Sequence, residues 1–75
     1  MTDAQTKILL GIRELEVSNK PRLPSFRDVA THLGLSGAGA VAYHLPVLVA
    51  LGLVMPQEGR RGLVLTGKGR RAARR

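Results

Sequence analysis

The sequence has no cysteine and no tryptophan, and its aromatic side chains are limited to Phe26 and Tyr43. Without thiols, the chain can form neither a disulfide framework nor a thiolate metal site. Because rings are scarce, its core must be built from aliphatic side chains. The 75 residues make one domain. A chain this short buries only about 60% of its unfolded surface, so we expect modest stability.

Long hydrophobic runs are also missing. The longest, from Leu45 to Met55, is too short to cross a bilayer, which takes about 20 residues. The first residues, MTDAQTK, lack the apolar stretch of a signal peptide. We therefore expect a cytoplasmic protein that has no membrane partner.

Acidic residues are few. Five of them stand against twelve lysines and arginines, which gives a net charge of +7, and none follows Glu58. Seven of the twelve basic residues come after residue 59. A solvated surface usually mixes the two signs, whereas a basic segment of one sign is typical of a domain that meets nucleic acid. A charge that serves solubility, or contact with another polyanion, is the alternative.

Residues 25–53 carry the clearest local signals, and they predict a helix, a tight turn and a second helix. Ser25 can cap the first helix with Asp28 as its partner three residues later. Gly34 can end that helix in a left-handed conformation, and Ser36 is expected to cap the second helix. Apolar residues recur at helical spacing in both segments: Phe26, Val29, Ala30 and Leu33, then Val41, Leu45 and Leu48. Two helices joined in this way make a helix-turn-helix.

A further helix is predicted in front of this unit, over residues 2–17. Thr2 and Gln5 have the spacing of a capping box. Behind them Ile8, Leu9, Ile12 and Leu15 form one apolar stripe.

Two short strands are predicted after the unit, over residues 54–57 and 63–65, around a basic turn that contains Arg60 and Arg61. The predicted fold is therefore mainly α with a small β-hairpin: a winged helix-turn-helix of three helices and a two-stranded wing. We expect residues 1–66 to form this domain. Residues 67–75 would form a basic tail or a short frayed helix capped by Thr66.

Pro46 lies inside the second helix of the unit, where it removes a hydrogen bond and clashes with the carbonyl of Ala42. We expect a kink there or a break into two short helices. The following residues are apolar on every side, so Val47, Val49 and Ala50 are candidates for a homodimer or protein contact. Burial of the same residues under the first helix and the wing is the alternative.

These motifs resemble the N-terminal DNA-binding domain of LexA-type repressors. The resemblance covers roughly residues 4–65 and rests on PSFRDVA at 24–30, LGLS at 33–36, VAYHLPVL at 41–48 and GLV at 52–54. It implies a winged fold that binds palindromic operators as a dimer. In LexA itself a self-cleaving protease domain follows. The present sequence stops before such a domain, so we expect no enzyme activity, and we expect no cofactor or metal.

The resemblance implies a DNA interface made from four parts of the chain. We expect Ser25 and Arg27 on phosphate, Ser36, Gly37, Gly39, Ala40 and Tyr43 in the major groove, Arg60 and Arg61 on the wing, and Lys68, Arg70 and Arg71 as non-specific attraction.

The start of the second helix departs from the family, because glycine and alanine stand where polar side chains recognise bases. Direct recognition would be limited to Ser36, the Tyr43 hydroxyl, backbone amides on phosphate, and contact of Ala40 or Ala42 with thymine methyl groups. Specificity would then depend on DNA shape and on arginines in the minor groove.

The function indicated by the sequence is a DNA-binding transcriptional regulator, most simply a repressor. Two alternatives stay open: a winged-helix module that binds a protein partner, and an architectural protein that coats DNA with little regard to sequence.

Overall fold

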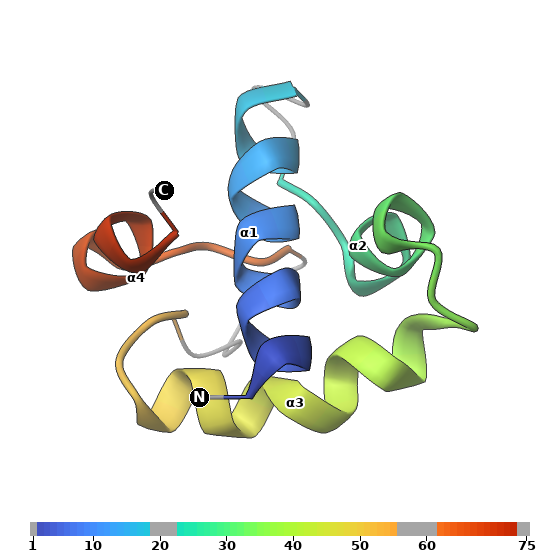
Figure 1. Ribbon diagram of the computed structural model, residues 1–75. Coiled ribbons are helices and arrows are strands. Elements are labelled where there is room, and N and C mark those ends of the chain that lie inside the picture. The colour runs from blue at the N-terminus through green and yellow to red at the C-terminus, as the bar shows by residue number, and fades with distance from the viewer. Residues whose placement is uncertain (1, 19–22, 56–61, 74–75) are drawn as a thin grey trace.

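The computed structural model describes residues 2–18, 23–55 and 62–73, and helices dominate it (Figure 1). The helices are α1 (Asp3–Ser18), α2 (Phe26–Leu33), α3 (Ala38–Ala50) and α4 (Gly67–Ala72). In Figure 1, α1 stands at the centre, α2 and α4 lie on opposite sides of it, and α3 crosses below. The prediction of a mainly helical chain is confirmed.

The two predicted capping boxes are both present. At the start of α1, the Thr2 amide donates to Gln5 Oε1 at 3.0 Å, and the Gln5 amide donates to Thr2 Oγ1 at 3.2 Å. At the start of α2, the Ser25 amide donates to Asp28 Oδ2 at 2.9 Å and the Asp28 amide donates to Ser25 Oγ at 3.0 Å. Each box satisfies two amides that the first turn of a helix leaves without a partner.

The start of α3 differs from the prediction that Ser36 caps it. The helix begins at Ala38, and Gly37 occupies the capping position with no side-chain hydrogen bond. Ser36 lies one residue too early in the chain to reach the first free amides. The first turn of α3 therefore has no side-chain cap.

Pro46 was expected to cause either a kink in α3 or a break into two helices, and the structure excludes the break. The helix runs from Ala38 to Ala50 with Pro46 inside it. Residues on both sides of the proline are anchored in the core, since Val41 and Leu48 are fully buried and Leu45 is 7% exposed. This burial offsets the loss of one backbone hydrogen bond, which costs about 3 kcal/mol in a regular helix.

An aliphatic core joins the helices, as the scarcity of aromatic residues requires. Phe26 and Leu33 pack against it while partly exposed. The buried hydrophobic residues are Ile8, Leu9, Ile12, Val29, Ala30, Val41, Leu45, Leu48, Leu53, Val54, Leu63, Leu65 and Ala73.

The predicted hairpin is represented, within the described residues, by one antiparallel bridge between Val54 and Leu65 and by no strand. The Met55 amide donates to the Val64 carbonyl at 2.8 Å, and the Thr66 amide donates to the Leu53 carbonyl at 3.1 Å. Alternation along this segment turns the Leu63 amide away from residues 53–55, and it donates to the Pro24 carbonyl at 2.8 Å. The turn with Arg60 and Arg61 lies outside the described residues.

The short helix α4 is capped by Thr66 as predicted, since the Gly69 amide donates to Thr66 Oγ1 at 2.9 Å. It packs against α1, where Arg70 contacts Glu16 through two hydrogen bonds of 3.0 and 3.3 Å. Gly69 is buried, and a Cβ atom at this position would overlap the carbonyl oxygen of Leu53. The absence of a side chain at Gly69 is therefore what lets α4 lie so close to the chain that follows α3.

In the described residues, no single helix has the length and hydropathy of a membrane span. Only α2 and α3 taken together have the length and the hydropathy of a membrane span, and the chain turns by 109° between them.

The capping assignment predicts unequal effects of two serine substitutions. Ser25→Ala should lower the free energy of unfolding by about 1 kcal/mol, because it removes the acceptor of the Asp28 amide. Ser36→Ala should change it by less than about 0.5 kcal/mol, as is usual for an exposed site. Urea denaturation of the two variants measures the difference, and equal losses would contradict the assignment.

The close contact of α4 predicts a second pair of unequal effects. Gly69→Ala should destabilise the protein by about 1–3 kcal/mol, because the added methyl group has no space beside the Leu53 carbonyl. Gly67→Ala is the control, since a Cβ there meets only Arg71 Nη1 at 3.7 Å, an ordinary contact. Alanine also favours the helix, so thermal unfolding should show an unchanged or raised Tm for the control. A tolerated Gly69→Ala would contradict the packing of α4.

Candidate functional site

The turn between α2 and α3 has the geometry of a helix-turn-helix. Gly34 adopts a left-handed conformation, with φ of 70°, as predicted. Its amide donates to the Thr31 carbonyl at 3.2 Å, and the Leu35 amide donates to the Ala30 carbonyl at 2.8 Å. These bonds close α2, and the chain then turns by 109° into α3. Helix-turn-helix units have angles of about 90–120°.

The residues of α3 divide into a buried face and an exposed face. We define the outward face of α3 as its exposed stripe at helical spacing, which consists of Gly39, Ala42, Tyr43, Pro46, Val47 and Ala50. Tyr43 is 79% exposed and Val47 is 43% exposed. This face carries no charged side chain, and the Tyr43 hydroxyl is its one side-chain hydrogen-bonding group.

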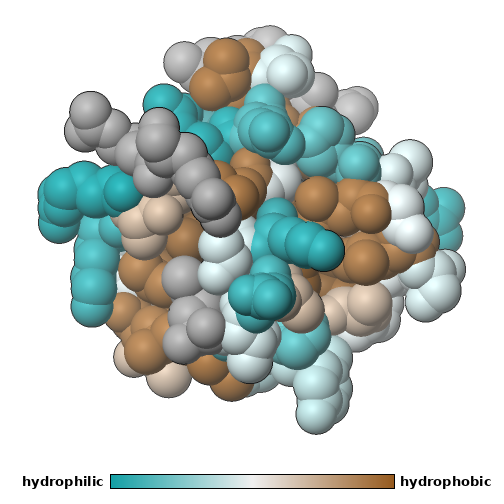
Figure 2. Space-filling view, in the orientation of Figure 1, coloured by the Kyte–Doolittle hydropathy of each residue, from teal (hydrophilic) through white to brown (hydrophobic). Residues whose placement is uncertain are grey.

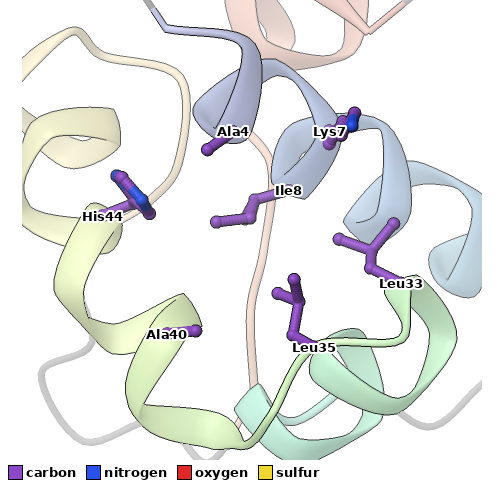
Figure 3. Close-up of a pocket in the computed structure, with 7 residues that line it drawn as sticks. All are labelled: Ala4, Lys7, Ile8, Leu33, Leu35, Ala40 and His44. Carbon is purple, nitrogen blue, oxygen red and sulfur yellow. The ribbon is translucent and has the colours of Figure 1, made fainter.

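The predicted major-groove residues do not all share this face. Gly39 and Tyr43 lie on it, and Ser36 is exposed in the turn just before the helix. Gly37 and Ala40 are half-buried. Figure 3 places Ala40 on the side of α3 that faces α1.

A pocket of about 140 Å³ occupies the space between that side of α3 and the start of α1 (Figure 3). Apolar side chains make most of its wall, and the two groups with nitrogen are Lys7 and His44. The lining residues are Ala4, Lys7, Ile8, Leu33, Leu35, Ala40 and His44. The pocket thus belongs to the seam between α1 and the helix-turn-helix, on a different side of α3 from the outward face.

A buried glutamine fixes α3 against α1 beside this pocket. Gln5 is 7% exposed, and its amide nitrogen lies 3.3 Å from His44 Nδ1. The same side chain accepts the Thr2 amide, so every polar atom of Gln5 has a partner. His44 also contacts the Tyr43 ring edge-on, with centroids 5.1 Å apart. The role of Gln5 was missed, because its spacing indicates only a helix cap.

The predicted phosphate contacts at the start of α2 are accessible. Arg27 is exposed in the first turn, and in the described part of the chain it forms no ion pair. Ser25 is half-buried and its oxygen accepts the Asp28 amide, which leaves its hydroxyl hydrogen available as a donor. Arg60 and Arg61 lie outside the described residues.

The basic residues of α4 are exposed. This helix lies on the other side of α1 from α2, and Figure 2 shows hydrophilic atoms on that side, at the left. Two of the basic residues have partners within the fold. Lys68 Nζ donates to the Leu51 carbonyl at 3.1 Å, and Arg70 holds Glu16. Arg71 is exposed.

The candidate partner contact beyond Pro46 is only partly accessible. Val47 and Ala50 are exposed, whereas Val49 is half-buried and packs against the core. Leu51, which follows α3, is 40% exposed and extends the apolar surface. In Figure 2, hydrophobic atoms cover the lower left of the molecule, where the C-terminal half of α3 lies in Figure 1.

No group of three histidine, cysteine, aspartate or glutamate side chains that could hold a metal ion occurs among residues 2–18, 23–55 and 62–73. In this part of the chain the histidines serve other contacts. His32 Nε2 lies 2.6 Å from Glu14 Oε1 on the neighbouring α1, and His44 contacts Gln5.

Comparison with known proteins gives two agreeing matches. Residues 1–61 match the LexA DNA binding domain. Among curated proteins, the LexA repressor of Citrifermentans bemidjiense is 37% identical over 75 residues, an alignment that covers 97% of this chain and 36% of the relative. The chain thus spans about a third of the length of that protein. No solved structure matches. The family match over most of the chain, together with the helix-turn-helix of α2 and α3, establishes that the chain belongs to the LexA DNA-binding domain family.

Proposed function

We propose that this chain binds double-stranded DNA and acts as a transcriptional repressor, with α3 in the major groove. The observation that carries the proposal is the family match over residues 1–61, which includes the whole helix-turn-helix. The 109° turn supports it, because in helix-turn-helix proteins the second helix enters the groove while the first crosses the backbone. The net charge of +7 supplies attraction to phosphate.

In the proposed interface, charged residues position the protein on the phosphate backbone, and α3 recognises bases in the major groove. Ser25 and Arg27 contact phosphate at the start of α2, and Arg60 and Arg61 reach phosphate or the minor groove. Ser36, Gly37, Gly39, Ala40 and Tyr43 face the major groove, with the half-buried Gly37 and Ala40 at its margin. Long-range attraction comes from Lys68, Arg70 and Arg71. The contribution of Arg70 is smaller, because it is paired with Glu16.

Dimerisation is part of the proposal. The exposed Val47 and Ala50 are the contacts through which two copies would meet, and Val49 supports them from the core. A dimer on DNA places its half-sites about 34 Å apart, or a multiple of that distance.

One observation favours the architectural alternative. The outward face of α3 has a single side-chain hydrogen-bonding group, whereas specific base recognition in the major groove generally uses arginine, asparagine, glutamine or acidic side chains. A binding selection distinguishes the two functions.

Selection from random duplex DNA should enrich a palindromic sequence. At about 150 mM salt, non-specific attraction is weakened, so enrichment reports recognition of sequence. Binding without enrichment would favour the architectural function. Failure to bind any duplex would reject both DNA functions and favour a protein partner at Val47, Ala50 and Leu51.

The proposed contacts between basic side chains and phosphates predict how the affinity for DNA depends on salt concentration. With about five to eight basic groups on phosphate, the slope of log K against log salt concentration should be about −4 to −7. Arg27→Ala should make the slope less negative by about 1, because one phosphate contact is lost. The matched control is Arg13→Ala, which removes the same charge from α1, where Arg13 donates to Glu16 at 3.3 Å. Fluorescence anisotropy titrations measure both slopes, and equal slopes would contradict the placement of Arg27.

A further inference from the structure

The outward face of α3 lacks the groups that distinguish bases by hydrogen bonding. Base pairs differ in the major groove by their pattern of donors and acceptors, which amide, guanidinium and carboxylate side chains recognise in pairs of bonds. None of these side chains occurs anywhere in α3, whose sequence is AGAVAYHLPVLVA. To select a sequence, a helix of this composition must therefore recognise a feature of the base pairs other than their hydrogen-bonding pattern.

The 5-methyl group of thymine is the apolar feature that the major groove offers, and it distinguishes A·T from G·C pairs by contact with apolar side chains. The outward face of α3 matches this chemistry. In its N-terminal half, the part that meets base edges in helix-turn-helix proteins, Gly39, Ala42 and Tyr43 are all exposed and follow one another at helical spacing.

The three residues differ in what they present. Ala42 presents one exposed methyl group. Tyr43 presents a ring that is 79% exposed and is held edge-on against His44. A Cβ atom added at Gly39 would meet nothing within 4 Å, so the glycine is not needed for packing inside the protein. The missing side chain instead allows this turn of the helix to come closer to the floor of a groove.

Five other residues of α3 are turned away from this contact. Val41, Leu45 and Leu48 are buried in the core. Ala40 and His44 line the pocket toward α1 (Figure 3). The sequence offers two alanines, Ala40 and Ala42, for contact with a thymine methyl group. The fold leaves Ala42 accessible.

We propose that α3 recognises the 5-methyl groups of pyrimidines, with Ala42 and the Tyr43 ring as the specificity-determining contacts. The ligand class is duplex DNA rich in thymine or 5-methylcytosine. The inference rests on the proposed DNA-binding function, which supplies the groove and the phosphate contacts that place α3 in it.

The test uses four duplexes of equal length and alternating sequence. Two contain adenine with either thymine or uracil, and two contain guanine with either cytosine or 5-methylcytosine. Within each pair, the hydrogen-bonding groups are identical and only the methyl group differs. Affinity measured by anisotropy should fall by about 4-fold for each methyl group contacted when uracil replaces thymine, and it should rise when 5-methylcytosine replaces cytosine.

Three variants assign the effect to residues. Ala42→Ser replaces the methyl group by a hydroxymethyl group and should bring the ratio of thymine to uracil affinities toward 1. Ala72→Ser makes the same change at an exposed position at the end of α4, outside the proposed contact, and should leave the ratio unchanged. Tyr43→Phe removes the hydroxyl but keeps the ring, so the ratio should also be retained. Circular dichroism melting of each variant establishes that it is folded.

The outcomes separate the inference from the function beneath it. Equal affinity for all four duplexes, with binding retained, would overturn methyl recognition and leave the DNA-binding function standing. Loss of the ratio in Tyr43→Phe would also overturn the inference, because recognition would then depend on the hydroxyl. If none of the four duplexes binds, the DNA-binding function fails and the inference fails with it.

Discussion

The left-handed backbone at Gly34 is the constraint on which the rest of this structure depends. It lets the amides of Gly34 and Leu35 bond back to carbonyls of the helix they follow, so α2 ends within one residue. The chain then turns by 109°, and α3 crosses under both α1 and α2. Residues with a Cβ atom rarely adopt this conformation, so the position of α3 depends on a single glycine.

A second contact, made by Gln5, holds α3 in the position that the turn has given it. Gln5 is buried between α1 and α3, where its three polar groups bond to Thr2 and His44. An unpaired amide at this depth would cost about 1–3 kcal/mol, so arrangements that separate α3 from the start of α1 are disfavoured. The apolar core supplies most of the attraction between these helices, and the glutamine adds a preference for one relative position.

The sequence predicted best those features that depend on neighbours three or four residues away. The caps at Thr2, Ser25 and Thr66 and the turn at Gly34 are local chemistry, and each is present. Contacts between distant residues could not be predicted, because one sequence does not indicate partners such as Gln5 and His44 or Glu16 and Arg70, which are 39 and 54 positions apart. The cap of α3 was expected at Ser36, one residue before the position that Gly37 occupies. Of the kink or break expected at Pro46, the break is absent, because the burial of Val41 and Leu48 holds both sides of the proline in one helix.

The division of α3 into two faces has a consequence for how such a protein can change. The outward residues contribute almost nothing to the core, since the stabilising contacts of the helix come from the opposite side. Substitutions at Gly39, Ala42 and Tyr43 can therefore alter what the helix binds while the scaffold stays folded. In this small domain, the proposed recognition surface is free to diverge, or to be redesigned, separately from the residues that keep the protein folded.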